Sequence, residues 1–415
     1  MEWDSISLDQ ICEFKNGLWK GKKEPFIPVG VIRNTNFTKD GSLNDSDIAY
    51  LDVEAKQFST RKLEFGDLIL EKSGGGPKQP VGRVIPFEKK SGDFSFSNFT
   101  SIVRIKDKTI LHYSYLHKFL HYLYVTGATE TMQRQSTGIR NLQLKEYKLI
   151  DVPFPPLSEQ KRIVVLLDTV FADLEQTRAK TEQNLKNARE LFDSYLQQVF
   201  SQKSEDIKAI PLGELVEVLT DYHANGSYKV LKQHVELSEQ EDFAWMVRST
   251  DFEKKFQNAK RYISEHAYNY LTKSKLFGGE IIMSKIGNAG KVYLMPAADR
   301  ACSLAMNLFL IRLDPSKANN EYVYRYLNSS SGKAQITPKL KGAATQTITK
   351  DNVRSLLIPI PPLEEQTEHI LALQKLEIET KALETLYLKK LDHINELKKS
   401  ILQKAFSGEL TAAAE

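Results

Sequence analysis

Basic and amide side chains gather in four short stretches near the start of the chain. These stretches read NGLWKGKK (16–23), VIRNTNF (31–37), EKSGGGPKQPVGR (71–83) and QRQSTGIRNL (133–142). Arg and Asn side chains can form paired hydrogen bonds with guanine and adenine edges, whereas Lys side chains mostly neutralise phosphates. Glycines let a backbone approach a phosphate closely. Together these residue types indicate a surface that binds DNA.

Two stretches in the second half of the chain have a similar character, SKIGNAGK (284–291) and KLKGAATQTITK (339–350). Each stretch alone is also typical of an ordinary solvated turn, and the basic segment 251–264 is interpreted as a solvated helix face. Several such stretches in one chain favour DNA binding. The candidate contacts are Trp19, Lys20, Lys22, Arg33, Asn34, Asn36, Lys72, Ser73, Lys78, Gln79, Arg83, Arg134, Gln135, Arg140, Asn141, Ser284, Lys285, Asn288, Lys291, Lys339, Lys341, Thr345 and Gln346.

Residue patterns for catalysis are missing from the sequence. Neither Pro-Pro pair is followed by the aromatic residue of a methyltransferase motif, and no Walker phosphate loop is present. His117 and His121 share a helix face, but without a third ligand they are interpreted as packing or surface residues. Asp67 and Glu71 do not have the spacing of a nuclease carboxylate cluster. We therefore expect no active site, no metal site and no cofactor in this chain.

Length and composition are those of a soluble protein with several compact units. A chain of 415 residues is too long for one ordinary core, and its 41% apolar and 27% charged residues are unremarkable. The net charge of +4 allows a polyanionic partner only where positive charge is locally concentrated. Cys12 and Cys302 cannot build a disulfide framework, so we expect buried thiols in a reducing compartment. The absence of an apolar span or signal-peptide core predicts a cytoplasmic location.

One sequence motif occurs twice, as PFPPLSEQ (153–160) and as PIPPLEEQ (359–366). Residues 153–201 align with 359–407 without a gap, and 15 of these 49 positions are identical. A gapless match means that the length of the segment is constrained, which is typical of a helix used as a spacer. Both segments are rich in Glu, Lys, Gln, Leu and Ala, with apolar residues at steps of three and four.

These patterns predict two long helices, at 158–202 and 364–408, each about 65 Å long at about 1.5 Å per residue. A surface coiled coil without a specific role would have the same pattern. The duplication favours two helices that pack antiparallel in a coiled coil and give the chain an internal pseudo-twofold repeat.

The segments before the two helices are also related, but more loosely. ISLDQICEFKNG (6–17) resembles IPLGELVEVLTD (210–221), and YLHKFL (115–120) resembles YVYRYL (322–327). We therefore predict an α+β protein with two similar mixed domains, at 1–157 and 203–363, separated by the long helices and followed by a tail at 409–415. Two domains that share a scaffold but differ in their loops are typical of modules that read different targets.

With these repeats, the chain resembles a specificity (S) subunit of a type I restriction-modification system. The resemblance covers essentially the whole length and rests on two kinds of repeated motif. PPLSEQKRI (155–163) and PPLEEQTEHI (361–370) close the two domains, and LQQVFS (196–201) and LQKAFSGEL (402–410) close the two helices. A Gly-Asp or Gly-Glu pair also precedes an apolar strand in each domain.

The resemblance implies two target-recognition domains, each reading one half of a bipartite DNA site, with the helices setting the gap. It further implies docking of two methyltransferase (M) subunits, adenine-N6 enzymes that use S-adenosylmethionine, and of restriction (R) subunits that use ATP and magnesium. This chain would then direct DNA methylation and cleavage without catalysing either. Two alternatives remain, a recognition subunit of a type IIB or IIG-like enzyme and a stand-alone DNA-binding scaffold.

Overall fold

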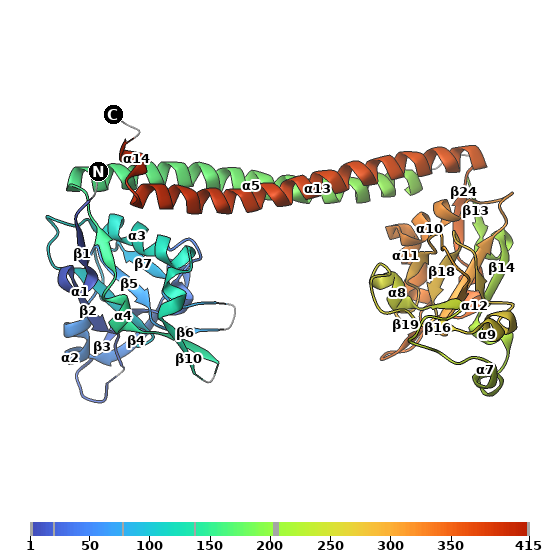
Figure 1. Ribbon diagram of the computed structural model, residues 1–415, viewed down its shortest axis with the longest axis horizontal. Helices are drawn as coiled ribbons and strands as arrows, with labels where there is room; N and C mark the ends of the chain where they lie inside the picture. Colours follow the sequence, from blue (N-terminus) through green and yellow to red (C-terminus); the bar gives the residue numbers. More distant parts are fainter. Residues whose placement is uncertain (1–2, 20, 77–78, 137, 202–206, 413–415) are drawn as a thin grey trace. The chain divides into compact units, whose positions relative to one another are not determined.

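The computed structural model describes residues 3–19, 21–76, 79–136, 138–201 and 207–412. The chain divides into two compact units: unit 1 contains Met1–Glu182 and Leu388–Glu415, and unit 2 contains Gln183–Tyr387 (Figure 1). The boundaries pass through the long helices α5 (Leu157–Ser201) and α13 (Leu363–Phe406). Each unit therefore contains the start of one long helix and the end of the other.

Unit 1 is built on an antiparallel sheet of four strands. Its order is β2 (Cys12–Asn16), β9 (Thr100–Ile105), β5 (Asp67–Glu71) and β7 (Val84–Phe87). Leu68 and Leu70 of β5 face the core under helix α3 (Tyr113–Val125), while Ile69 faces a second core. The strand is buried on both faces, which explains its continuous apolar run.

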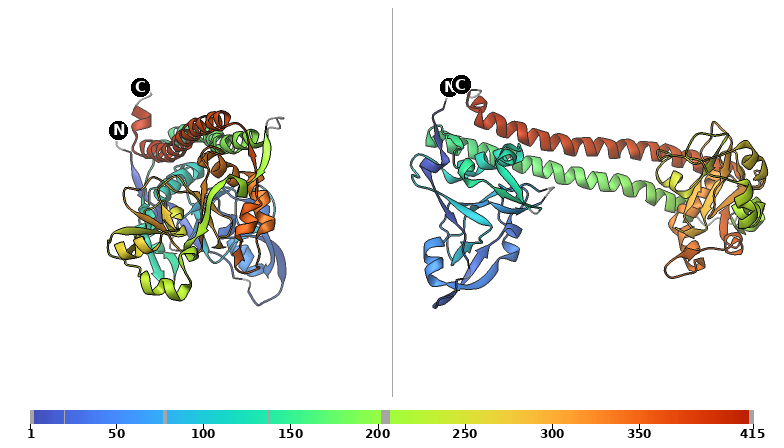
Figure 2. Two further views of the ribbon diagram at one scale, coloured as in Figure 1. Left: turned by 90° about the vertical axis from the view of Figure 1, so that its right-hand side faces the viewer. Right: turned by 60° about the horizontal axis from the view of Figure 1, so that its bottom comes forward.

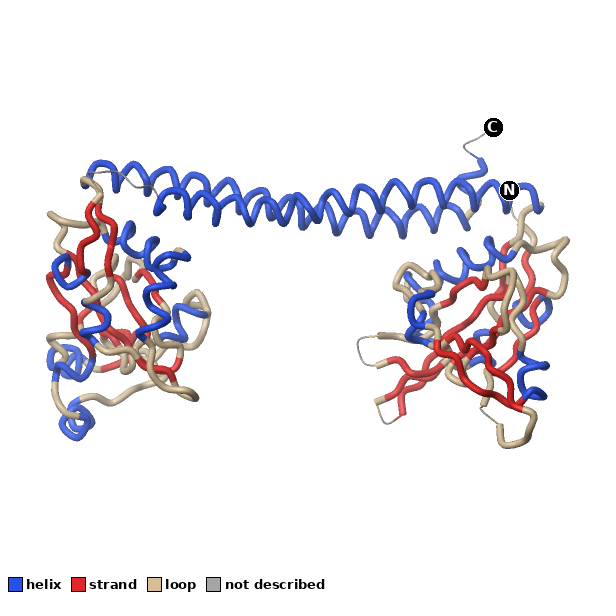
Figure 3. The backbone as a smooth tube through the Cα atoms, turned by 180° about the vertical axis from the view of Figure 1, so that it is seen from behind, coloured by secondary structure: helices blue, strands red, loops and turns tan. Residues whose placement is uncertain are grey.

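Three smaller sheets complete unit 1, and Figure 3 shows the strands in red and the helices in blue. The first pairs β4 (Ala49–Glu54), β3 (Phe26–Ile32) and β8 (Phe94–Phe96), and the second pairs β10 (Gln133–Ser136), β11 (Ile139–Leu142) and β6 (Ser73–Gly75). The third joins β1 (Ser5–Ser7) to β12 (Asp151–Pro153), the strand that leads into α5.

Unit 2 repeats this plan with strands of similar order. Its main sheet is β14 (Val216–Asp221), β22 (Leu308–Leu313), β18 (Ile281–Ser284) and β20 (Val292–Leu294), with helix α10 (Asn320–Asn328) beside it. The smaller sheets are β16 (Tyr262–Ile263), β15 (Ala244–Val247), β21 (Cys302–Leu304) and β17 (Lys275–Leu276), then β19 (Ile286–Gly287) with β23 (Gln346–Thr347), and β13 (Lys208–Pro211) with β24 (Leu357–Ile360). The mixture of helices and strands agrees with the predicted α+β class.

The end of α13 is part of the core of unit 1. Phe406 lies between two aromatic residues one turn apart on α3, with ring centroids 5.4 Å from Tyr115 and 5.3 Å from Phe119. Leu402 and Ala405 of α13 share this core with Ile163 and Leu167 at the start of α5. The two helix segments thus run side by side within unit 1, as the views in Figure 2 also show.

Unit 2 contains the matching arrangement with the two helices exchanged. Phe200, near the end of α5, lies 5.2 Å from Tyr322 and 5.4 Å from Tyr326 of α10, measured between ring centroids. Leu196 and Val199 share that core with Ile370 and Leu373 at the start of α13. The identical Leu and Phe residues of the repeated helix ends are therefore core residues of both units.

A buried glutamine joins each helix start to its own unit. Gln160 is fully buried, accepts a hydrogen bond from the backbone N–H of His112 at 2.9 Å and donates one to the carbonyl of Pro155 at 2.9 Å. Since His112 is the N-cap residue of α3, this side chain fixes α5 against α3. Gln366 of unit 2 bonds in the same way to the N-cap residue of α10 and to a proline before α13, at 2.8 Å each. These hydrogen bonds explain why both copies of the repeated motif end in Gln.

Polar contacts join the two long helices in both units and give their relative direction in unit 1. In unit 1, Glu175 pairs with Lys398 and Arg178 donates to Asn395, so residue numbers rise along α5 as they fall along α13. In unit 2, Arg189 pairs with Glu384 at 3.1 Å. The helix segments in unit 1 therefore run in opposite directions.

Both cysteines are free and buried, as predicted from the sequence. Burial raises the pKa of the Cys12 thiol to about 12 and that of Cys302 to about 11. At neutral pH both thiols are therefore protonated and act as small apolar residues. Within the described part of the chain, no helix combines the length and apolar character that a membrane crossing needs.

Replacing Phe406 with alanine should lower the free energy of unfolding of unit 1 by about 3–5 kcal/mol, because the ring is buried between α3 residues and leaves a cavity. Urea unfolding curves measure the change. The matched control is Leu397→Ala on the same helix, where the side chain is 47% exposed and the cost should stay below about 1 kcal/mol. Equal losses in the two variants would contradict the packing described here.

Candidate nucleic-acid interface

Three hydrogen bonds bring the four basic stretches of unit 1 together. Lys72 Nζ donates to Asn16 Oδ1 at 2.7 Å, Asn34 Nδ2 donates to the Ser73 carbonyl at 2.6 Å, and Ser73 Oγ donates to Asn141 Oδ1 at 2.6 Å. Residues far apart in sequence thus form one surface, made of 16–19, 21–23, 31–37, 71–76, 79, 133–136 and 138–142, which we call the unit 1 face. That the stretches lie together is now established, and their binding to DNA stays a prediction.

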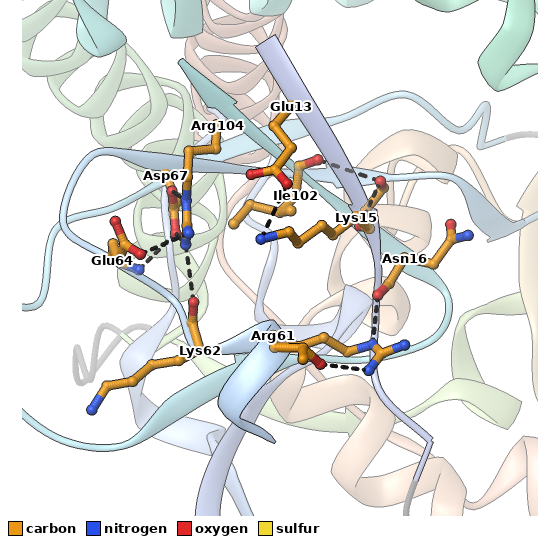
Figure 4. A network of polar contacts seen from close by, with 11 residues as sticks. Glu13, Lys15, Asn16, Arg61, Lys62, Glu64, Asp67, Ile102 and Arg104 are labelled. Atoms are coloured by element: carbon orange, nitrogen blue, oxygen red, sulfur yellow. Dashed lines mark hydrogen bonds and ion pairs between the residues drawn. The ribbon is translucent and has the colours of Figure 1, made fainter. Parts of the chain in front are cut away.

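The loop that carries Trp19 is anchored where β2 ends. A Cβ on Gly17 would lie 1.7 Å from the Ser97 carbonyl oxygen, so only glycine permits this approach. The next residue, Leu18, donates its N–H to Phe96 at 2.9 Å. Arg61 donates its Nε to the Asn16 carbonyl at 3.1 Å, a contact visible in Figure 4. The loop therefore leaves the sheet at a fixed point with Trp19 69% exposed.

Figure 4 also explains the Gly-Asp pair of the sequence motif. Asp67 is 2% exposed and accepts two hydrogen bonds from Arg104 at 2.7 Å each. In unit 2 the matching acid, Glu280, pairs with Arg312 at 3.1 Å. These carboxylates neutralise a cation on the neighbouring strand, so they are structural. The sequence-based rejection of a nuclease cluster at Asp67 and Glu71 agrees with this arrangement.

The hairpin of β10 and β11 carries four of the candidate contacts. In its register Arg134 faces Asn141 and Gln135 faces Arg140. Because opposed residues of an antiparallel pair point to the same side, each side of the hairpin presents one Arg and one amide. Arg134 and Gln135 are exposed, and Arg140 lies 3.7 Å from Glu130.

Two other candidates do not lie on the surface. Arg83 is 8% exposed and forms a two-pronged ion pair with Glu71, at 2.7 and 2.8 Å. Burial alone would lower the pKa of Arg83, but the hydrogen bond and charge of Glu71 outweigh it and raise the pKa above its ordinary value. Asn36 is fully buried, and its Oδ1 accepts from the backbone N–H of Arg33 at 2.9 Å. Both side chains shape the unit 1 face from beneath.

The remaining candidates of unit 1 divide between exposed and undescribed positions. Lys22 and Gln79 are exposed, while Lys72 and Ser73 are half-buried. Burial lowers the pKa of Lys72. Lys20 and Lys78 lie outside the residues that the structure describes.

In unit 2 two of the candidate cations are already paired with carboxylates. Lys285 bonds to Asp221 at 3.0 Å, and Glu253 accepts from Asn288 at 2.9 Å and from Lys291 at 3.1 Å. The hydrogen bond from Lys291 lowers the pKa of the Glu253 carboxyl. The surface formed by the candidate residues of unit 2 is therefore less positive than the sequence suggested. Ser284 is also buried, so it is not on the surface.

Three exposed candidates of unit 2 lie on one tight turn. Strand β23 pairs with β19, which joins the stretches 284–291 and 339–350 as β11 and β6 are joined in unit 1. Gly342 has a φ of +102°, and a Cβ there would lie 2.3 Å from the Thr345 carbonyl oxygen. The turn exposes Lys341, Thr345 and Gln346, whereas Lys339 bonds to Ser355 at 2.8 Å.

Sequence analysis missed Arg248, the counterpart of Arg33. VIRNTNF (31–37) corresponds to MVRSTDF (246–252), and in both the Arg follows a strand paired parallel to its neighbour. Arg248 donates to Asp251 Oδ1 at 2.8 Å and to the Ala259 carbonyl at 2.7 Å. Comparing the two domains residue by residue would have revealed this position.

His117 is buried in unit 1 and His121 is half-buried beside it, so both fit the interpretation as packing or surface residues. His117 is buried with Nε2 3.2 Å from the Val84 carbonyl oxygen. Burial lowers the pKa of His117 to about 3 and that of His121 to about 4, with smaller contributions from His121 and Lys118 respectively. Across the described residues, no group of three or more His, Cys, Asp or Glu side chains is placed to hold a metal ion.

Acid should destabilise unit 1 through this histidine pair. In the unfolded chain both histidines bind protons below their ordinary pKa of 6.5, whereas in the folded unit they stay neutral down to about pH 4. The unfolded chain therefore binds more protons in this window, and the free energy of unfolding falls as the pH drops through it. His121→Gln should flatten this fall by up to about 3 kcal/mol. Urea unfolding from pH 8 to pH 4 measures it, and an equally steep acid limb in the variant would contradict the prediction.

Comparisons with known proteins agree on one family. The family model described as the type I restriction modification DNA specificity domain matches residues 1–185 and 204–399. The type I restriction enzyme StySPI specificity subunit of Salmonella potsdam is 22% identical over 408 residues, covering 94% of this chain and 84% of that protein. The EcoKI specificity subunit of Escherichia coli K12 is 24% identical over 413 residues, with 94% and 84% coverage.

Solved structures show the same fold. The HsdS subunit from Thermoanaerobacter tengcongensis matches with a TM-score of 0.65 at 16% identity, covering 98% of this chain and 97% of that one. A chain from a study of complex assembly and conformational transition of the type I R-M system matches with a TM-score of 0.72, also at 16% identity and with the same coverage.

Proposed function

This chain belongs to the family of type I restriction modification DNA specificity domains, and from that premise we propose that each unit reads one half of a bipartite DNA target. The observation that carries the proposal is the set of three hydrogen bonds that gathers four separate basic stretches into the unit 1 face. One rigid surface with Arg, Asn, Gln and Lys side chains suits both base edges and phosphates.

The two units recognise different half-sites. On the unit 1 face the Arg and amide pairs of the β10–β11 hairpin, Arg134 with Asn141 and Gln135 with Arg140, are the leading candidates for base contacts. In unit 2 the exposed turn with Lys341, Thr345 and Gln346 takes that role. The carboxylates that hold Lys285 and Lys291 leave fewer cations for phosphates there.

The long helices act as a spacer that sets the gap between the half-sites. We propose that they pack over their whole length as an antiparallel coiled coil with a pseudo-twofold relation between the units. The matching cores at the helix ends and the opposite order of contacts in unit 1 support this proposal. Helices of 45 and 44 residues reach about 65 Å at about 1.5 Å per residue.

Catalysis belongs to partner subunits in this proposal. Two methyltransferase subunits dock on the helices and use S-adenosylmethionine, and restriction subunits complete the enzyme with ATP and magnesium. This chain binds no cofactor itself and works in the cytoplasm. Its membership of a specificity family supports this division of labour.

One heptad inserted into each helix should lengthen the gap between the half-sites and leave both half-sites unchanged. The insertion points are after Arg189 and before Glu384, which face each other in an ion pair. Seven residues add about 10 Å of helix, or about three base pairs of DNA. Methylome sequencing of a host with the variant gene and its methyltransferase gene measures the gap, and an unchanged gap would exclude the spacer role.

Exchanging residues 1–157 for those of a relative with another target should change one half-site only. The same methylome measurement gives the result, and the exchange of 203–363 is the matched control that should change the other half. A chain that bound its full site tightly without any methyltransferase would favour a stand-alone scaffold instead.

A further inference from the structure

We propose that a hollow in unit 1 holds a single DNA base that has left the double helix. This inference rests on the proposed function, because unit 1 must lie on DNA for a base to reach the hollow. The hollow has a volume of about 480 Å³. Its lining is mainly apolar and includes Leu18, Val31, Leu51 and Val53 together with two aromatic residues, Trp19 and Phe99.

Three polar atoms in the lining have no partner. Arg33 Nε, Asn34 Oδ1 and Ser97 Oγ are shielded from solvent, and none forms a hydrogen bond with any residue that the structure describes. Leaving such groups unpaired costs free energy, so their presence in one hollow indicates a ligand. The orientation of the Asn34 amide is fixed, because its Nδ2 must donate to the Ser73 carbonyl.

The chemistry of these groups matches a nucleobase. Arg33 Nε–H is a donor, Asn34 Oδ1 is an acceptor, and the Ser97 hydroxyl can be either. Every DNA base carries an acceptor beside a donor along one edge and has a flat face that stacks on aromatic rings. Trp19, at 69% exposure, and Phe99, at 47%, have the free aromatic surface that such stacking uses.

The walls of the hollow are held before any ligand arrives. The Phe99 carbonyl accepts hydrogen bonds from the backbone N–H groups of Lys72 and Ser73, at 3.0 and 3.2 Å. A Cβ on Gly74 would lie 2.8 Å from Asn34 Nδ2, so glycine lets the β6 loop close on Asn34. A site fixed in this way loses little freedom on binding, which favours affinity.

The corresponding backbone positions of unit 2 carry different side chains. Ser97 corresponds to Ala305, since both donate their N–H to the residue that ends the neighbouring parallel strand, at 2.9 Å in each unit. Phe99 corresponds to Asn307, whose carbonyl accepts from Lys285 at 2.7 Å. The Nε of Arg248 is bonded to Asp251 at 3.3 Å. The ring, the hydroxyl and the unpaired donor of unit 1 therefore have no equivalent at these described positions of unit 2, and base capture should occur in the half-site that unit 1 reads.

The test uses the complete complex of this chain with its methyltransferase subunits. Duplexes carry a mismatch, or 2-aminopurine, at each position of the half-site read by unit 1. Enzymes that modify a base flip it out, so one opened position is the methylated base itself. We expect one further position where 2-aminopurine fluorescence changes and where a mismatch tightens binding, because the mismatch removes part of the cost of opening the pair.

Trp19→Ala should abolish both effects at that further position and weaken binding to the matched site about 5- to 100-fold, as expected for one lost base–aromatic stack. Tyr50→Ala is the control, because Tyr50 is 67% exposed and points away from the hollow that the next residue, Leu51, lines. The control should change affinity less than about twofold.

Equal effects of the two variants, or no opened position besides the methylated base, would overturn the inference. So would binding of free adenosine that quenches Trp19 emission while Trp19→Ala leaves DNA affinity intact, because the hollow would then hold a free nucleoside. If domain exchange still alters one half-site, the proposed function survives such a failure. If that exchange alters neither half-site, the proposed function itself has failed.

Discussion

The structure depends on how the two ends of each long helix are buried. An isolated helix of this length has nothing to fix its position, since its middle is largely polar. Here Gln160 and Gln366 satisfy buried backbone groups at the two helix starts, and Phe406 and Phe200 fill aromatic slots at the two ends. Buried polar groups without partners are costly, so each helix end is fixed in its own unit, and the two helices can change length only together. This constraint on both helix ends explains why residues 153–201 align with 359–407 without a gap.

The same rigidity serves the candidate interface. Pairs such as Asp67 with Arg104 and Glu71 with Arg83 neutralise buried charges behind the loops, and backbone bonds hold the loops themselves. A fixed frame lets loop residues vary without loss of the fold. The two units show this freedom: position 97 is Ser in unit 1, and its counterpart at 305 is Ala, although the backbone hydrogen bond is the same.

Sequence reasoning located the long helices within one or two residues, the two buried thiols and the repeated plan of the domains. It failed at individual side chains. Arg83 follows a glycine-rich stretch and reads like a surface cation, but the partner that draws it into the core, Glu71, lies on β5. Lys285 and Lys291 likewise meet Asp221 and Glu253, from 64 and 38 residues away. Such pairings depend on strand register, which composition does not reveal.

By itself the sequence determined the periodic features, because helical periodicity, proline breaks and a constant repeat length are local or additive properties of the chain. Only the tertiary structure decided which polar groups form hydrogen bonds within the fold and which remain available to a ligand. Arg33 and Asn34 follow β3 and Ser97 follows β8, and their unpaired atoms line one hollow because these two strands pair side by side. Whether a hydrogen-bonding group is satisfied depends on neighbours in space, and those neighbours are fixed by folding.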